Sequence, residues 1–325
     1  MEGRLCPLHT YTTYHVREMS GQSVFQRARR KLIIPFLLPQ FILFTFITVL
    51  PIIATVAFAF TDWQGMANTN PAWAGVTQFR VITMDPNFLN AVKNSFFLMI
   101  IGGVMLFVPA FIIAWGLNQP LRWRKYYRFL ILAPVVLSVS VAGLLWKWIY
   151  NPSFGLIGVA LKLIGQSLDI EALAKGVMSN TSTALTAIII ASIWHGIGTW
   201  VLLLSAGIER IPPEIPESAK IAGANDWQVF WYITLPLMWE VVRILLVLWV
   251  MQALQAFSFV FVMTGPVGVG GPLNSTQLIG TLVYLMTFKS FKWAYGMALA
   301  TTMMLVIFVL STITNRGLMR EAVEF

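Results

Sequence analysis

The chain has 325 residues, of which 58% are hydrophobic and 11% are charged. Soluble globular proteins are typically about 45–50% apolar and about 25% charged. This composition therefore excludes a soluble enzyme, a disordered chain and a nucleic-acid-binding domain. The single cysteine, Cys6, and three histidines supply no internal disulfide and no metal site, so we expect neither.

Six stretches are long and apolar enough to cross a membrane, which takes about 20 residues. They are Leu32–Phe60, Ser95–Leu117, Phe129–Trp146, Thr183–Gly207, Ile244–Met263 and Tyr295–Ile313. They contain no Lys, Arg, Asp or Glu. The pattern predicts an all-α integral membrane protein with six transmembrane helices. Three prolines in the first stretch predict a helix that is kinked or shorter than the apolar run.

The distribution of Lys and Arg predicts the orientation of these spans. Basic residues concentrate before the first span, between the second and third, between the fourth and fifth, and after the sixth. The other connections, Thr61–Asn94, Lys147–Ser182 and Thr264–Ala294, carry fewer. We therefore expect a multi-pass membrane protein with both termini in the cytoplasm.

The same pattern sets the expected domain organisation. Residues 1–31 form a basic cytoplasmic segment without the features of a signal peptide, residues 32–315 form the membrane domain, and residues 316–325 form a cytoplasmic tail. Either Met1 or Met19 is compatible with the natural start. Within the outer connections, Leu156–Ile164 is expected to form a short amphipathic or interfacial helix.

The cytoplasmic loop at residues 208–236 carries the most distinctive local pattern. Pro216 suits the first turn of a helix, and Glu217 favours its positive end. Gly223 suits a left-handed residue that ends this helix, and Asn225 with Gln228 predicts a capping box that opens a second helix. Small side chains keep the first helix slim enough to enter a groove on a partner. A plain surface hairpin is the alternative interpretation.

This loop resembles the EAA loop of binding-protein-dependent ABC importers, whose pattern is E-A-A-x-x-D-G-A, nine residues and then I-x-L-P. The matching residues are Glu217, Ala219, Gly223, Ala224, Ile233, Leu235 and Pro236. Ser218 stands where the pattern has its first alanine, and Ala222 stands where it has aspartate. The resemblance implies that Glu217, Ser218, Ala219, Gly223 and Ala224 couple the chain to an ATPase subunit.

Other segments resemble the carbohydrate branch of this family, which includes the larger membrane subunit of the maltose transporter. Examples are Phe60-Thr61-Asp62-Trp63, Trp146-Lys147-Trp148 followed by Asn151-Pro152, and Gly270-Gly271-Pro272. The resemblance covers roughly residues 32–315, and it includes no counterpart of that subunit's large external domain. It implies the type I ABC importer permease fold and import of a sugar or oligosaccharide.

The resemblance also implies partners. They are a second, related permease in a heterodimer, two ATP-binding cassette ATPase subunits and an external solute-binding protein, with the chain in a bacterial inner membrane. The sequence contains no Walker motif, so we expect that this chain is not an enzyme and binds no cofactor. ATP and magnesium would be used by the partner ATPases.

The fifth span contains polar residues at membrane depth. Gln252 and Gln255 are one helical turn apart, and Trp249 extends the same face. Polar side chains at this depth usually face the bundle interior or a water-filled path. Amides for hydroxyl groups and an aromatic face for C–H groups suit a sugar. Hydrogen bonding between helices is the alternative role for these glutamines.

The family's sugar contacts, carried over without gaps, fall on further positions. In the fifth span they fall on Trp249, Gln252, Ala253 and Ala256, and in the fourth on Gly196 and Thr199. Alanines replace the family's asparagines at Ala253 and Ala256. Next to Gly196, His195 is expected to be a neutral histidine bonded to a neighbouring helix in preference to a substrate contact.

There are two alternatives to sugar import. The same importer architecture could carry another solute, such as glycerol 3-phosphate, and acidic oligosaccharides also stay open because cations could come from the partner permease. An intramembrane enzyme would need clustered acids or histidines at the membrane surface. The acids near the span ends form no recognisable pair, which argues against this class.

Overall fold

The computed structural model describes residues 35–65, 70–167, 176–265 and 268–319. Within these ranges the regular elements are helices, apart from a single antiparallel bridge between Thr61 and Trp73. The expected segment at residues 1–31, including Met19, lies outside the described residues. The chain divides into two units, Met1–Ala57 and Phe58–Phe325.

The first unit is described from residue 35, and it is a membrane-length helix. An apolar helix runs through Pro35–Phe58, and its most hydrophobic window contains no buried residue. A π-helical turn, η1 (Thr45–Val49), precedes α2 (Leu50–Phe58), which carries Pro51 in its first turn. Because proline has no N–H, the wider turn is a typical local adjustment at such a position. The helix therefore keeps a full membrane-spanning length despite its prolines.

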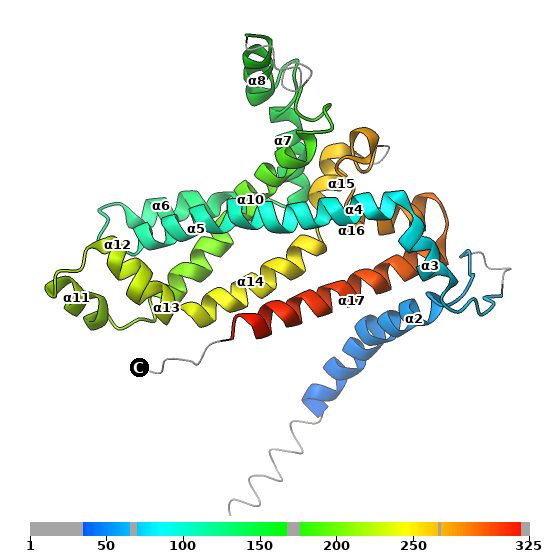
Figure 1. The fold of residues 1–325 in the computed structure, drawn as a ribbon, viewed down its shortest axis with the longest axis horizontal. Coiled ribbons are helices and arrows are strands. Elements are labelled where there is room, and N and C mark those ends of the chain that lie inside the picture. The colour runs from blue at the N-terminus through cyan, green and yellow to red at the C-terminus, as the bar shows by residue number, and fades with distance from the viewer. Residues whose placement is uncertain (1–34, 66–69, 168–175, 266–267, 320–325) are drawn as a thin grey trace, which may run out of the picture. The chain divides into compact units, whose positions relative to one another are not determined.

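The second unit is a helical bundle (Figure 1). Its first half contains α3 (Thr77–Met84), α4 (Pro86–Phe97), η2 (Leu98–Gly102), α5 (Gly103–Leu117), α6 (Arg124–Leu132), η3 (Ala133–Val136), α7 (Val139–Ile149) and α8 (Leu156–Ser167). Its second half contains α10 (Ala184–Ile208), α11 (Glu214–Ile221), α12 (Asp226–Val229), η4 (Phe230–Thr234), α13 (Leu235–Leu237), α14 (Trp239–Leu254), α15 (Ser258–Thr264), η5 (Pro272–Asn274), α16 (Ile279–Tyr284), η6 (Leu285–Lys289) and α17 (Trp293–Gly317).

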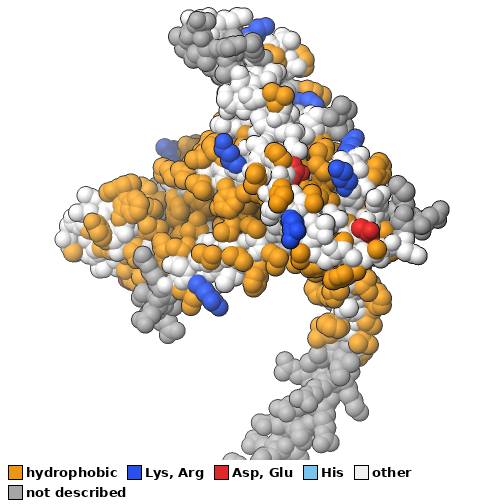
Figure 2. Space-filling view, turned by 45° about the vertical axis from the view of Figure 1, so that its right-hand side comes forward, with side chains coloured by type: hydrophobic (Ala, Val, Ile, Leu, Met, Phe, Trp, Pro, Cys, Tyr) orange, Lys and Arg blue, Asp and Glu red, His pale blue; other side chains and the backbone are white. Residues whose placement is uncertain are grey.

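The described residues contain five apolar helices of spanning length and one bent helix pair that completes six. Four of the five lie in the second unit, at Pro86–Leu117, Ala184–Ile208, Trp239–Thr264 and Trp293–Gly317. Hydrophobic side chains cover much of the face in Figure 2, as a bundle in contact with lipid requires. The fold is therefore the expected all-α membrane fold.

The second span begins earlier than the sequence predicted. The prediction started at Ser95, whereas the helix starts at Pro86. Asp85 caps this start by accepting a hydrogen bond from the Asn87 N–H at 2.9 Å. Proline at the first helical position costs no hydrogen bond, because that N–H would have no partner within the helix. Hydropathy did not predict this extension, because the first turns of α4 contain polar residues.

The third span, predicted at Phe129–Trp146, is not one straight helix but a bent pair of helices. The helices Arg124–Val136 and Val139–Ile149 meet at an angle of 96°. Pro134 lies in the short 3₁₀ turn η3, and Leu137 after it is extended. Ser138 then caps α7 by accepting a hydrogen bond from the Val141 N–H at 3.3 Å. A serine cap beyond a proline turn restarts the helix in a new direction.

The fifth span is interrupted as well. The predicted span Ile244–Met263 lies within the apolar helix Trp239–Thr264, but the regular helix is interrupted between α14, which ends at Leu254, and α15, which begins at Ser258. The residue before α15, Phe257, has φ −140° and ψ −54°, outside the helical region. The predicted span contains no proline or glycine, so its sequence gives no sign of this break.

The core lies between helices that are distant in sequence. α10 packs on α5, α14 on α17, and α15 on α7. The connection Thr264–Ala294, for which no helix was predicted, contains α16 and supplies buried side chains at Leu278, Ile279 and Leu282. α16 is too short to span a membrane, and it is apolar because it belongs to the core.

Candidate functional site

A cavity of about 420 Å³ lies between α10, the interrupted span α14–α15, and the start of α7. The residues that line it are Leu98, Leu106, Val139, Ile188, Ser192, Ile193, His195, Gly196, Trp200, Trp249, Gln252, Ala253, Gln255, Ala256, Phe257, Ser258, Phe259 and Val260. The lining combines aromatic rings, two amides and hydroxyl groups. Irregular backbone inside a membrane occurs where it is buried in protein or lines such a cavity.

Both sequence-predicted glutamines lie at the helix break. Gln252 is on the last turn of α14, Gln255 follows that helix, and both side chains are exposed to the cavity region. At the break, the Ala256 N–H reaches the Ala253 carbonyl only at 3.4 Å, the length of a weak hydrogen bond. The site therefore offers side-chain amides and loosened backbone groups together.

Trp249 reaches the cavity but is also a packed structural residue. Its Nε1–H donates to the Met99 carbonyl in the π-helical turn η2 at 2.8 Å. Its ring packs edge-on against Phe107 and Trp200. A Cβ atom at Gly103 would lie 2.7 Å from Trp249 Nε1, so glycine is needed for this approach. The indole is thus held in place by its contacts with α5 and η2.

His195 bonds to the neighbouring broken helix and also lines the cavity. Its Nε2 lies 2.9 Å from the carbonyl oxygen of Leu137, the extended residue between η3 and α7. Its ring meets Phe259 edge-on at 5.5 Å between ring centres. The hydrogen bond fits the expectation of a histidine bonded to a neighbouring helix.

The remaining path residues divide into two groups. Ala253, Ala256 and Gly196 line the cavity, and a Cβ atom at Gly196 would meet no atom within 4 Å. Thr199 does not line it and is exposed on α10. Sequence reasoning missed Ser192 and Val139, since a lone serine or valine in an apolar span gives no signal. Their positions depend on how α10 and α7 pack.

The loop with the EAA-like pattern forms two short helices joined at Gly223. α11 ends in a Schellman motif, in which the Gly223 N–H donates to Lys220 O and the Ala224 N–H donates to Ala219 O, each at 3.0 Å. Gly223 has φ +94°, as the sequence predicted for a left-handed terminator. The small residues Ser218 and Ala219 lie on the helix that precedes this turn.

The second helix of the loop starts with the predicted capping box. Asn225 accepts from the Gln228 N–H and Gln228 accepts from the Asn225 N–H, both at 2.8 Å. Lys220 Nζ lies 2.7 Å from Asp226 Oδ1 and ties the two helices together across Gly223. Ile221 is 88% exposed and Trp227 is 61% exposed. A rigid hairpin thus presents apolar side chains outward.

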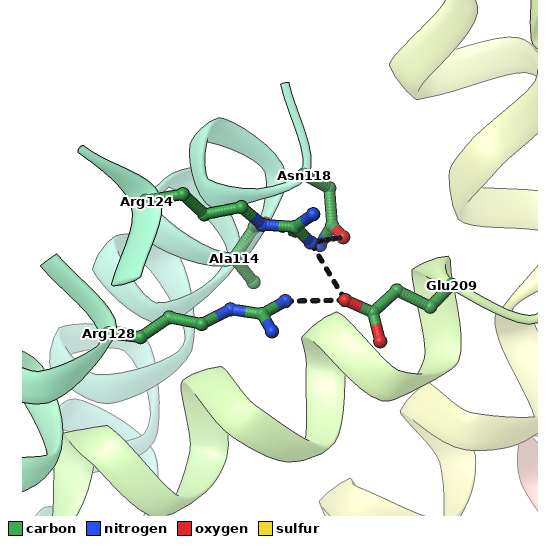
Figure 3. A network of polar contacts seen from close by, with 5 residues as sticks. All are labelled: Ala114, Asn118, Arg124, Arg128 and Glu209. Carbon is green, nitrogen blue, oxygen red and sulfur yellow. Dashed lines mark hydrogen bonds and ion pairs between the residues drawn. The ribbon is translucent and has the colours of Figure 1, made fainter. Parts of the chain in front are cut away.

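An ion network anchors the base of this loop (Figure 3). Glu209, directly after α10, pairs through Oε1 with Arg124 at 2.7 Å and with Arg128, both on α6. Arg124 also donates to Asn118 Oδ1 at 2.8 Å, and the Asn118 amide donates to the Ala114 carbonyl on α5. The Arg128 hydrogen bond, with the charges of Arg128 and Arg124, lowers the pKa of Glu209 despite its partial burial. Sequence reasoning treated these arginines only as an orientation signal.

Comparisons with known proteins agree with this architecture. A family model described as "Binding-protein-dependent transport system inner membrane component" matches residues 19–320. The chain is 32% identical to a probable ABC transporter permease protein of Pyrococcus horikoshii, over 85% of this chain and 92% of that one. It is 30% identical to the multiple sugar-binding transport system permease protein MsmF of Streptococcus mutans, over 87% and 91%.

A solved structure extends the likeness to the fold. A chain of a bacterial ABC transporter involved in the import of the acidic polysaccharide alginate superposes with a TM-score of 0.77 at 22% identity, covering 91% of this chain and 98% of that one. The family match spans nearly the whole sequence. The chain belongs to the binding-protein-dependent transport system inner membrane components, the permease subunits of ABC importers.

Proposed function

We propose that this permease passes a sugar or oligosaccharide, delivered by an external binding protein, through the cavity at the interrupted fifth span. The observation that carries this proposal is the lining of that cavity, where Gln252, Gln255 and Ser258 lie among aromatic rings. Amides and hydroxyls bond to sugar hydroxyls, while rings cover the apolar faces of a sugar. Relatives named as sugar permeases support the same reading.

An uncharged sugar fits this lining better than glycerol 3-phosphate. A phosphate group is normally bound by arginine, lysine or a helix N-terminus. The described residues around the cavity include His195 but no lysine or arginine. His195 Nε2 is already engaged with Leu137. A phosphorylated solute would therefore depend on cations from the second permease.

The two-helix hairpin formed by α11, the Gly223 turn and α12, which we call the coupling hairpin, supports the proposed assembly. Glu217, Ser218, Ala219, Gly223 and Ala224 lie on an exposed helix and its turn, a shape that suits a groove on an ATPase subunit. The complex would contain a second related permease and two ATPase subunits, which use the ATP and magnesium. Movement of the ATPases would shift the hairpin as a rigid body and switch the access of the cavity.

The proposed orientation places both termini and the hairpin in the cytoplasm. Single cysteines near Asn70, Gln166 and Asn274 are expected to react with a membrane-impermeant thiol reagent from outside. A cysteine at Asn225 is expected to react only from inside. Labelling of that position from outside would overturn the orientation.

Uptake measurements test the proposed function. The gene is deleted, and uptake is measured for labelled neutral oligosaccharides, uronate oligosaccharides and glycerol 3-phosphate. Loss of neutral-sugar uptake, restored by the wild-type chain but not by a chain with Gly223→Val, is the expected result. Unchanged uptake of every sugar together with loss of glycerol 3-phosphate uptake would refute the sugar assignment.

A further inference from the structure

Three contacts join α6 and α10 between the coupling hairpin and the cavity. At the cytoplasmic end, Glu209 binds Arg124 and Arg128. At the cavity end, His195 Nε2 bonds the carbonyl of Leu137. We call this line of contacts the α6–α10 seam. Along α10 it extends for about 21 Å at the usual rise of about 1.5 Å per residue.

The middle of the seam is a close approach of two backbones. A Cβ atom at Gly198 would lie only 2.4 Å from the carbonyl oxygen of Ile131 on α6. No flexible side chain separates the helices at this point, so neither helix can shift far without moving the other. Packed elements of this kind move as units and do not deform continuously.

The ion network is poorly explained by stability alone. The side chains of Arg124, Arg128 and Glu209 are 36%, 34% and 47% exposed, and exposed ion pairs typically contribute about 0–1 kcal/mol. Their placement is more informative. Glu209 is the first residue after α10 and opens the segment that leads into α11. The pair of arginines therefore holds the base of the hairpin to α6 (Figure 3).

We infer that Glu209 is a positioning residue for transport, which fastens the coupling hairpin to the α6–α10 seam so that hairpin movement reaches His195 in the cavity wall through its partner Leu137. This inference rests on the proposed function, because it needs an ATPase that moves the hairpin. It adds residues outside the EAA-like pattern to the coupling machinery. α6 and η3 act as the rigid element, since the chain that follows them bonds to His195 through Leu137 and lines the cavity at Val139.

The test follows cavity access in the assembled importer in proteoliposomes. Cys6→Ser removes the native thiol, and Ser258→Cys places a reporter in the cavity lining. The labelling rate by a membrane-impermeant maleimide is compared without nucleotide and after trapping with magnesium, ATP and vanadate. For the wild-type network we expect a change of about fivefold or more, the lower range of typical coupling between sites.

Glu209→Gln is expected to reduce this change to less than about twofold, while the ATPase subunits still copurify. The exchange Arg128→Glu with Glu209→Arg retains two arginines and one glutamate and is expected to restore the change. Glu240→Gln is the matched control, because the exposed Glu240 side chain forms an ion pair within α14 to Arg243 at 3.5 Å, outside the seam. It is expected to behave like the wild type.

The outcomes distinguish a failure of the proposed function from a failure of the inference about Glu209. An absent nucleotide effect in the wild-type network contradicts the proposed function. A normal wild-type effect that persists in Glu209→Gln contradicts the inference alone. If the charge exchange stays as defective as Glu209→Gln, the ion pairing is not what matters and the inference also fails.

Discussion

The coupling hairpin and the cavity depend on contacts of very different sequence separation. In the hairpin, the Gly223 turn, the capping box and the Lys220–Asp226 pair all join residues within six positions of each other. The cavity instead requires Trp249 to bond to Met99, and His195 to bond to Leu137. The hairpin is therefore a local structure carried by its own sequence, whereas the cavity exists only in the assembled bundle.

Trp249→Ala tests whether the cavity depends on distant packing. Removing an indole fixed by Met99, Phe107 and Trp200 is expected to cost about 3–5 kcal/mol, because a void remains in the core. Thermal unfolding of the purified complex measures this loss. Trp249→Phe, which keeps a ring but loses the hydrogen bond, is expected to cost about 1 kcal/mol. Equal stability of Trp249→Ala and wild type would show that the cavity does not depend on this distant packing.

Gln252→Leu tests the role of the cavity in solute binding, because it removes an amide without removing packing. A buried sugar hydroxyl left unpaired costs about 1–3 kcal/mol, which corresponds to a tenfold or larger fall in uptake at about 1.4 kcal/mol per decade. Basal ATP hydrolysis should persist, because the hairpin is intact. Leu248→Ala is the control, since Leu248 is exposed on α14 outside the cavity. A greater uptake loss in Leu248→Ala than in Gln252→Leu would show that the wrong face was assigned.

Gly223→Val is the corresponding change in the hairpin. No atom lies within 4 Å of a Cβ atom at this position, so the cost arises from the backbone at φ +94°. It is expected to be about 1–2 kcal/mol and to misdirect α11. Transport and solute-stimulated ATP hydrolysis should fall, while insertion and unfolding temperature of the bundle change little. Gly223→Asn, which tolerates this conformation better, should retain more activity. Normal stimulation in Gly223→Val would contradict the coupling role.

The smallest expected effect is the pH dependence of the Glu209 network. Arg128 and Arg124 lower the pKa of Glu209, so the folded state binds this proton less readily than the unfolded chain does. The stabilisation is complete above the ordinary glutamate pKa of about 4.3 and is lost as pH falls through the lowered value. The unfolding temperatures of wild type and Glu209→Gln should thus differ constantly from pH 7 to pH 5 and converge in more acidic solution. Convergence already near pH 6 would contradict this assignment.

The spans and the hairpin were predictable because their signals are local. Hydropathy located the six crossings, and the spacing of Gly223, Asn225 and Gln228 predicted the observed turn and cap. Gln252 and Gln255 were recognised because polar residues are costly in a membrane unless they face a cavity or a partner. What the sequence did not predict was the 96° bend between η3 and α7 and the interruption of the fifth span after Leu254.

The sequence by itself determined that this chain is a helical membrane protein with a preformed two-helix hairpin at Gly223, because hydrophobicity, charge and turn chemistry act over a few residues. Only the tertiary structure decided where the third and fifth spans break, which side chains surround the cavity, and how Glu209 meets α6. A helix interrupted in a membrane must place its freed polar groups against distant partners. Those partners, such as His195 for the Leu137 carbonyl, are brought together by packing alone.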